Sequence, residues 1–134
     1  MRVLAVDFGE KRIGLATSDA SGRLATPRRT LARRDDASAL DEIARFCGEE
    51  EVELVLFGVP RSPEGVESPF AARIRSFAAK FSARAGLPVE FHEETLTSRE
   101  AAARLPPGAE RGEVDRMAAA VLLEDFLKSG RVLP

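Results

Sequence analysis

The chain has 134 residues, a net charge of −2 at neutral pH and a single cysteine, Cys47. This length predicts one domain over residues 1–134, which can bury roughly two-thirds of its unfolded surface without disulfides. The lone cysteine and the absence of a basic, apolar leader before Val3 favour a cytoplasmic protein. The apolar runs are too short to span a bilayer, and the slightly acidic balance gives no overall attraction to nucleic acid.

The first predicted element is a hairpin over residues 3–18. Its first strand contains an unbroken apolar run, residues 3–6, which is typical of a strand buried on both faces. Asp7 follows this run, and Gly9 and Gly14 permit a tight reversal of the chain. Asp7 on its own has two interpretations: it caps the turn, or it is a functional carboxylate at the end of a central strand.

The middle of the chain is predicted to alternate strands and helices. A strand over residues 23–31 contains Pro27, which cannot donate a hydrogen bond in a central ladder and so predicts a sheet edge. Apolar residues at helical spacing predict helices over residues 35–48 and 68–86. An apolar run between them predicts a buried strand over residues 52–59. Strand, helix, strand in this order predicts parallel pairing through a crossover.

The C-terminal third is predicted to contain a strand, a short helix, a mobile loop and a long helix, over residues 89–92, 97–104, 106–112 and 113–128. Three strands in hairpin connection followed by alternating helices and strands are the element order of a ribonuclease H-like fold. We therefore predict an α/β protein with a five-stranded mixed sheet, flanked by helices, in which antiparallel hairpin strands are joined by parallel ones.

In such a sheet, three acidic residues from distant parts of the chain converge. The strands that end at Asp7 and Glu94 run parallel, so both residues lie at the same edge of the sheet. Asp115, predicted in the first turn of the last helix, can reach that edge. Each carboxylate alone has a structural interpretation, but together they repel unless a cation lies among them. Hard oxygen ligands select Mg²⁺ or Mn²⁺, and two such ions could activate water against a phosphodiester.

Four segments together resemble the YqgF family of bacterial RuvC-like, ribonuclease H-fold Holliday junction resolvases, generally regarded as pre-16S rRNA nucleases. The resemblance runs from the N-terminus to about Gly130, and its residues are Asp7-Phe8-Gly9 with Lys11-Arg12-Ile13-Gly14 and Ser18-Asp19, Gly58-Val59-Pro60 with Gly65, His92-Glu93-Glu94-Thr95-Leu96-Thr97-Ser98 with Ala101, and Val114-Asp115 with Ala118-Ala119.

The resemblance implies a metal-dependent nuclease that trims the 5′ end of precursor 16S rRNA during ribosome maturation. Matched by position, the catalytic metal-binding residues are Asp7, Glu94 and Asp115. Further residues implied to contact the substrate are Lys11, Arg12 and Ser98. The implied partners are precursor 16S rRNA, branched DNA and the ribosomal particle, and the protein would act as a monomer or a homodimer.

Three positions depart from the family pattern. Glu93 is one methylene longer than the aspartate that the family usually has there. Thr95 stands where the family usually has an arginine that contacts the substrate, and Glu113 stands where a basic residue is common. Two further features have open interpretations. The arginines within residues 28–34 form either a basic patch or a solvated edge. His92 is either a general base or, as is commoner for a lone histidine at a strand end, a structural residue.

Three other functions compete with RNA processing. Residues 7–9 also resemble the first phosphate loop of actin-like ATPases, although those enzymes clamp ATP between two domains. A non-catalytic nucleic-acid-binding assembly factor could keep the same fold. Within nuclease chemistry, a Holliday junction resolvase must act on two strands as a symmetric dimer, whereas an RNA processor can act as a monomer.

Overall fold

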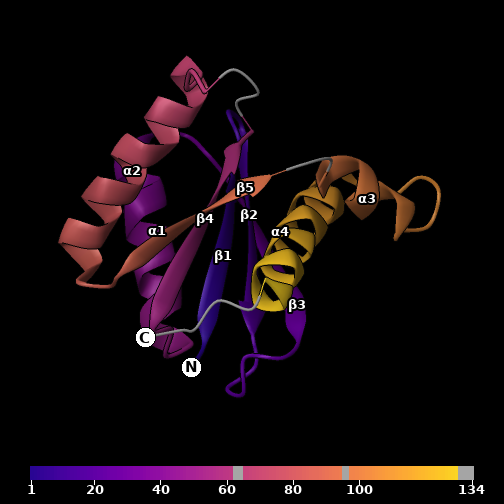
Figure 1. Cartoon of the computed structure of the whole chain (residues 1–134), viewed down its shortest axis with the longest axis horizontal. Helices are drawn as coiled ribbons and strands as arrows, with labels where there is room; N and C mark the ends of the chain where they lie inside the picture. Colours follow the sequence, from indigo (N-terminus) through magenta and orange to yellow (C-terminus); the bar gives the residue numbers. More distant parts are fainter. Residues whose placement is uncertain (62–64, 95–96, 130–134) are drawn as a thin grey trace.

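The computed structural model of the chain describes residues 1–61, 65–94 and 97–129, except for the side chains of residues 97 and 98. A mixed sheet forms the centre, and helices cover both of its faces (Figure 1). In chain order the elements are β1 (Val3–Phe8), β2 (Arg12–Ser18), β3 (Ala25–Ala32), α1 (Asp36–Glu49), β4 (Leu54–Pro60), α2 (Pro69–Ala85), β5 (Val89–Glu94), α3 (Thr97–Ala103) and α4 (Arg111–Lys128).

The sheet has five strands in the order β3-β2-β1-β4-β5. The pairs β1–β2 and β2–β3 are antiparallel, whereas β1–β4 and β4–β5 are parallel. This topology confirms the predicted fold class. Pro27 lies in β3, at an edge of the sheet, where its missing N–H costs no hydrogen bond of a central ladder.

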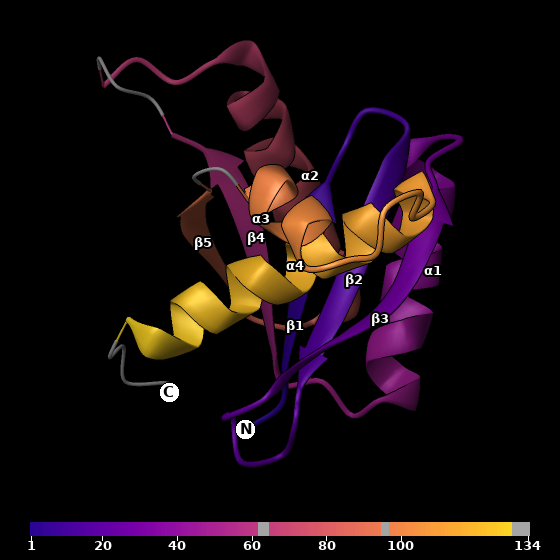
Figure 2. The same ribbon diagram turned by 90° about the vertical axis from the view of Figure 1, so that its right-hand side faces the viewer.

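Alternating residues of β1 build the cores on the two faces of the sheet. Leu4, Val6 and Phe8 belong to the core that α1 and α2 cover, and Phe8 packs against Phe77 with ring centroids 4.6 Å apart. Val3 and Ala5 face the other way, into the core beneath α4. Figure 2 shows α4 crossing this second face, with α3 packed against it.

The ends of α1 and α2 follow the signals in the sequence. Asp35 caps α1 by accepting a hydrogen bond from the Ser38 N–H at 2.7 Å, and Ser68 caps α2 in the same way. Gly86 ends α2 in the left-handed conformation, with φ of 70°. Gly48, by contrast, does not stop α1, which continues through Glu49, because a glycine is tolerated inside a helix at a modest cost.

The last helix begins earlier than predicted. It starts at Arg111 instead of Glu113, so Asp115 lies in the second turn and not in the first. Glu113 explains this start, since its Oε1 accepts a hydrogen bond from the Glu110 N–H at 3.4 Å and helps to cap the helix. The departure from the family pattern at Glu113 thus has a structural role.

Arginines of β3 and the turn after it mainly hold the edge of the sheet to α1. Arg28 forms an ion pair with Glu50 at 2.5 Å, and its guanidinium lies over the ring of Phe46. Arg33 pairs with Asp36 at 3.2 Å and keeps only 8% of its side chain exposed. These contacts favour a structural edge over a free basic patch. None of the helices in the described segments is both long and apolar enough to cross a membrane.

Gly14 sets how closely α4 approaches the sheet. It lies in β2, directly opposite Asp7 of β1, on the face that α4 covers. A Cβ atom added at Gly14 would lie only 2.0 Å from the backbone oxygen of Asp115. The helix backbone therefore rests on the bare backbone of β2, which holds Asp115 beside Asp7.

We predict that Gly14→Ala lowers the free energy of unfolding by about 1–3 kcal/mol, because the new methyl group must push the backbone of α4 away from β2. Gly48→Ala is the matched control, since nothing lies within 4 Å of its added Cβ. That variant should be more stable than the wild type by about 0.5–1 kcal/mol, as expected for alanine in a helix. Urea unfolding measures both, and equal stability of Gly14→Ala and the wild type would contradict this packing.

Candidate carboxylate site

Asp7 is the central residue of the candidate site. It lies near the end of β1 and faces α4, in the same direction as Val3 and Ala5, which lie four and two residues earlier. On the β2 side, its neighbour is Gly14. On the β4 side, Gly58 follows the residue that pairs with Val6. Asp7 therefore has a glycine on each neighbouring strand, and neither has a side chain that could cover it.

Glu94 reaches Asp7 across the bare backbone of Gly58. It is the last residue of β5, and a Cβ atom added at Gly58 would lie 2.6 Å from its Oε1. The carboxyl groups of Glu94 and Asp7 hydrogen-bond to each other. Glu94 Oε1 is buried, and among the described residues it has no hydrogen-bond partner. An unpartnered buried carboxyl oxygen is costly, so it indicates a missing cation or donor.

Burial shifts the titration of both carboxyl groups. Desolvation, together with the neighbouring charge of Asp7 and the hydrogen bond to it, raises the pKa of Glu94 to about 9. Desolvation also raises the pKa of Asp7, although the hydrogen bond from Glu94 opposes this rise. At neutral pH the pair therefore keeps a proton, which Glu94 donates to Asp7. A divalent cation could replace that proton and bind both groups.

Asp115 lies close enough to Asp7 for its negative charge to contribute to the raised pKa of Asp7. Its Oδ2, however, accepts a short hydrogen bond from Arg12 Nε in an ion pair. Within the described part of the chain, no three acidic, histidine or cysteine side chains are close enough together to hold a metal ion. Two of the three predicted ligands, Asp7 and Glu94, are thus in contact. The third, Asp115, lies beside them and is paired with Arg12.

The residues present suit a divalent cation such as Mg²⁺ or Mn²⁺. Asp7 and Glu94 offer hard carboxylate oxygens, and one of these, Glu94 Oε1, is buried without a partner. Asp115 could join them by turning its side chain away from Arg12. The donor set contains no sulfur or imidazole, which disfavours softer metals.

The predicted substrate contacts lie in different surroundings. Lys11 is exposed in the turn between β1 and β2, while Arg12 is occupied by Asp115. Ser98 lies in α3, but its side chain is outside the described residues, as is Thr95. Sequence reasoning missed the spacing role of Gly58, although a glycine that interrupts an apolar strand was a visible signal of close approach.

His92 is not positioned as a general base for this site. Its Nε2 lies 2.5 Å from Asp125 Oδ2 of α4, and its ring meets Phe126 edge-on, with centroids 5.7 Å apart. These contacts tie β5 to the C-terminal end of α4, which supports the structural interpretation of His92.

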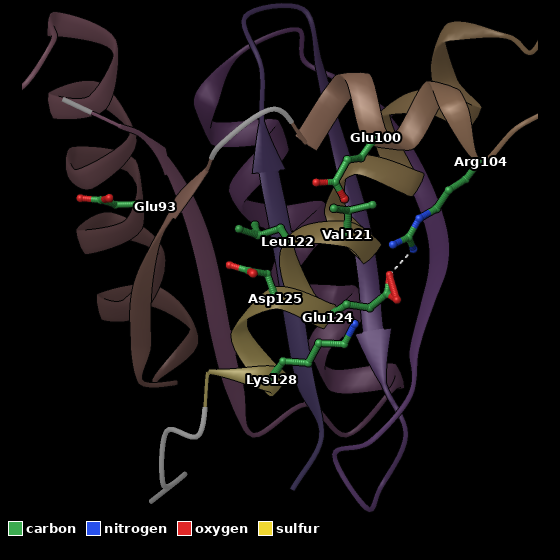
Figure 3. Close-up of a pocket in the computed structure, with 8 residues that line it drawn as sticks. All are labelled: Glu93, Glu100, Arg104, Val121, Leu122, Glu124, Asp125 and Lys128. Carbon is green, nitrogen blue, oxygen red and sulfur yellow. Dashed lines mark hydrogen bonds and ion pairs between the residues drawn. The ribbon is translucent and has the colours of Figure 1, made fainter. Parts of the chain in front are cut away.

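A separate pocket lies beside the carboxylate site, between β5, α3 and α4. Figure 3 shows its lining residues, in which Arg104 pairs with Glu124 and Glu93 points away from the others. None of the three predicted metal ligands lines it. Its acidic residues come mainly from the exposed faces of α3 and α4.

The proton on Glu94 predicts how the stability of the metal-free protein depends on pH. Glu94 ionises near pH 4.5 when unfolded and near pH 9 when folded, so only the folded state keeps this proton between these values. The free energy of unfolding should fall in this window as pH rises, by up to about 1.4 kcal/mol per pH unit. Glu94→Gln has no proton to lose at this position. Its free energy of unfolding should therefore exceed that of the wild type by an increasing amount as the pH rises.

Urea unfolding in EDTA from pH 5 to pH 9 measures this difference. Glu93→Gln, a change at the exposed neighbour, is the matched control and should follow the wild type. If Glu94→Gln and the wild type keep a constant difference across the range, the raised pKa of Glu94 is wrong.

Curated relatives match the chain almost from end to end. A protein of Anaeromyxobacter sp. (strain K) is 41% identical over 132 residues, which cover 95% of this chain and 96% of that protein. A protein of Chloroflexus aurantiacus (strain ATCC 29366 / DSM 635 / J-10-fl) is 35% identical over 137 residues, with 98% and 90% coverage. Both are named "Putative pre-16S rRNA nuclease".

Solved structures support the fold. The Thermus thermophilus RuvC chain in a complex with a Holliday junction substrate has a TM-score of 0.59 at 14% identity, covering 96% of this chain and 95% of that one. The Fowlpox virus resolvase in a complex with Holliday junction DNA also has a TM-score of 0.59 at 14% identity, with 96% and 98% coverage. At these identities the likeness concerns the ribonuclease H-like fold alone.

A sequence model described as "RuvX: Holliday junction resolvase" matches residues 1–129. RuvX is another name for the YqgF family, so the resemblance carried by the four sequence segments is confirmed. On this match and on the identity to its curated relatives, the chain belongs to the RuvX family.

Proposed function

We propose that this protein is a divalent-metal-dependent endonuclease that processes the 5′ end of precursor 16S rRNA. The observation that carries this proposal is the partly buried, hydrogen-bonded pair of Asp7 and Glu94 with Asp115 beside it. The family and the names of the curated relatives support the same chemistry. Residues 1–134 would form a single catalytic domain.

In this proposal, Asp7, Glu94 and Asp115 are the catalytic residues and hold Mg²⁺ or Mn²⁺. When bound, the ions supply an activated water and stabilise the leaving oxygen of the phosphodiester. The protein itself positions the ligands: the ladder between β1 and β2 fixes Asp7, the end of β5 brings in Glu94, and the contact of α4 with Gly14 places Asp115. Because these are regular elements, the ligands are held more rigidly than loops would hold them.

The substrate would approach past the turn between β1 and β2. Lys11 is exposed there, and Arg12 lies between it and Asp115, so both can reach phosphates next to the scissile bond. We place Ser98, near the start of α3, as a third contact. The overall charge of −2 makes such local cations necessary for binding a polyanion.

The proposed partner is precursor 16S rRNA, within or near the ribosomal particle in the cytoplasm, and a monomer would suffice for this reaction. The second candidate is resolution of Holliday junctions, because the family is described by that activity. That reaction needs a symmetric dimer to cut two strands. A non-catalytic assembly factor is the third possibility, and activity separates it from the other two.

We expect the purified protein to cut a 5′-extended 16S leader RNA in Mg²⁺ or Mn²⁺, but not in EDTA. Asp7→Asn should lower the cleavage rate at least about 100-fold, because it removes a central metal ligand. Mutating a residue that only supports a metal ligand already lowers metal affinity or activity by about 10–100-fold. The matched control is Asp41→Asn, which changes a half-exposed carboxylate of α1 on the opposite face of the sheet. Gel analysis of end-labelled RNA gives the rates.

A four-way DNA junction, assayed in parallel, separates the two nuclease functions. Cleavage of the junction alone, with paired symmetric cuts by a dimer, would replace RNA processing by junction resolution. If the folded protein binds both substrates but cuts neither, including 16S precursor within ribosomal particles, the nuclease proposal fails and an assembly factor remains.

A further inference from the structure

We propose that Arg12 holds Asp115 away from the metal site in the free protein and releases it when a substrate phosphate takes the guanidinium. Binding of nucleic acid and binding of metal would then be coupled. Arg12 is thus a positioning residue for the third ligand as well as a substrate contact. This inference rests on the proposed nuclease function.

First, the backbone at Asp115 cannot shift to move this residue from Arg12 to the metal site. Its carbonyl group lies on Gly14, where even a methyl group would not fit. The movement must therefore occur in the Asp115 side chain, by rotation about its own bonds. In the free protein the rotamer present directs Oδ2 to Arg12 Nε.

The second support is the incomplete ligand set. Asp7 and Glu94 are in contact, and Asp115 is near enough for its charge to act on Asp7, yet no group of three ligands is assembled among the described residues. The Arg12 guanidinium supplies a positive charge to Asp115, as a metal ion would. Arg12 and a cation therefore compete for the same carboxylate.

The third support is that a phosphate can reach Arg12. About 34% of its side chain is exposed, compared with 23% for Asp115. A guanidinium has five N–H donors, and the Nε–H alone accounts for the hydrogen bond to Asp115. The terminal nitrogens can make the first hydrogen bonds to an arriving phosphate, which then draws the guanidinium away from Asp115. Exposed Lys11, the preceding residue, adds charge at the same approach.

A phosphate that draws Arg12 away leaves Asp115 as an unpaired, partly buried anion beside Asp7. Such a charge is costly to leave uncompensated, so the affinity of the site for a divalent cation must increase. By thermodynamic linkage, a bound cation must increase the affinity for the phosphate chain by the same factor. The free protein would therefore bind its metal weakly, and the substrate would complete the site.

The test measures Mn²⁺ affinity from the signal of free Mn²⁺ in electron paramagnetic resonance, so it does not depend on cleavage. Without nucleic acid, Arg12→Gln should bind Mn²⁺ about tenfold more tightly than the wild type, within the usual 5–150-fold range of coupling. Lys11→Gln is the matched control, because it removes the same charge one residue away without freeing Asp115. Its Mn²⁺ affinity should stay within about twofold of the wild type.

A 2′-O-methyl oligonucleotide, shown by gel to stay intact during the titration, supplies the phosphates in the second arm. It should tighten Mn²⁺ binding about tenfold in the wild type and leave the affinity of Arg12→Gln unchanged. Asp7→Asn with the same oligonucleotide gives the Mn²⁺ bound by the phosphates alone, which is subtracted. The wild-type arm needs no change at Arg12, so it holds even if Arg12→Gln folds poorly.

The inference is overturned if Arg12→Gln binds Mn²⁺ no more tightly than Lys11→Gln, or if the oligonucleotide fails to tighten Mn²⁺ binding in the wild type. If the wild type still binds Mn²⁺ at Asp7 and cuts RNA, only the coupling is wrong and the nuclease function stands. If none of the proteins binds Mn²⁺ beyond the level of Asp7→Asn, the proposed function falls together with the inference.

Discussion

The site depends on two glycines, Gly14 and Gly58, which lie on either side of Asp7. Gly14 lets the backbone of α4 rest on β2, and Gly58 lets the Glu94 side chain cross β4. A side chain at either position would occupy the space through which another ligand reaches Asp7. The elements β1, β5 and α4 are far apart in the sequence. They therefore meet on one face of the sheet only because β2 and β4 each have a glycine there.

This close approach creates an electrostatic problem that the free protein solves in two ways. Three carboxyl groups lie near one another and are partly buried, which disfavours their charged forms. A proton shared by Glu94 and Asp7 neutralises one charge, and the guanidinium of Arg12 neutralises that of Asp115. On our proposal, a divalent cation would displace the proton and a substrate phosphate would displace the guanidinium. On the same proposal, the free protein would have a metal site with one ligand still missing.

Local patterns in the sequence predicted most of the fold. Apolar runs, helix caps and the proline of the edge strand each indicate the structure of their own segment. Asp7, Glu94 and Asp115 could be named from strand ends and from the family resemblance. The ion pair between Arg12 and Asp115, and the contact of His92 with Asp125, could not be predicted, since each joins side chains from distant elements. The early start of α4 was missed because Gly112 was taken as part of a loop.

The most direct test of the account is a crystal structure of the wild type grown with Mn²⁺ and a non-cleavable oligonucleotide, with anomalous scattering recorded from manganese. We expect an anomalous peak beside Asp7 and Glu94, with Asp115 turned from Arg12 to the metal and the Arg12 guanidinium on a phosphate. A phosphate chain seated beside Lys11 with no peak at Asp7, or with Asp115 still paired to Arg12, would contradict it.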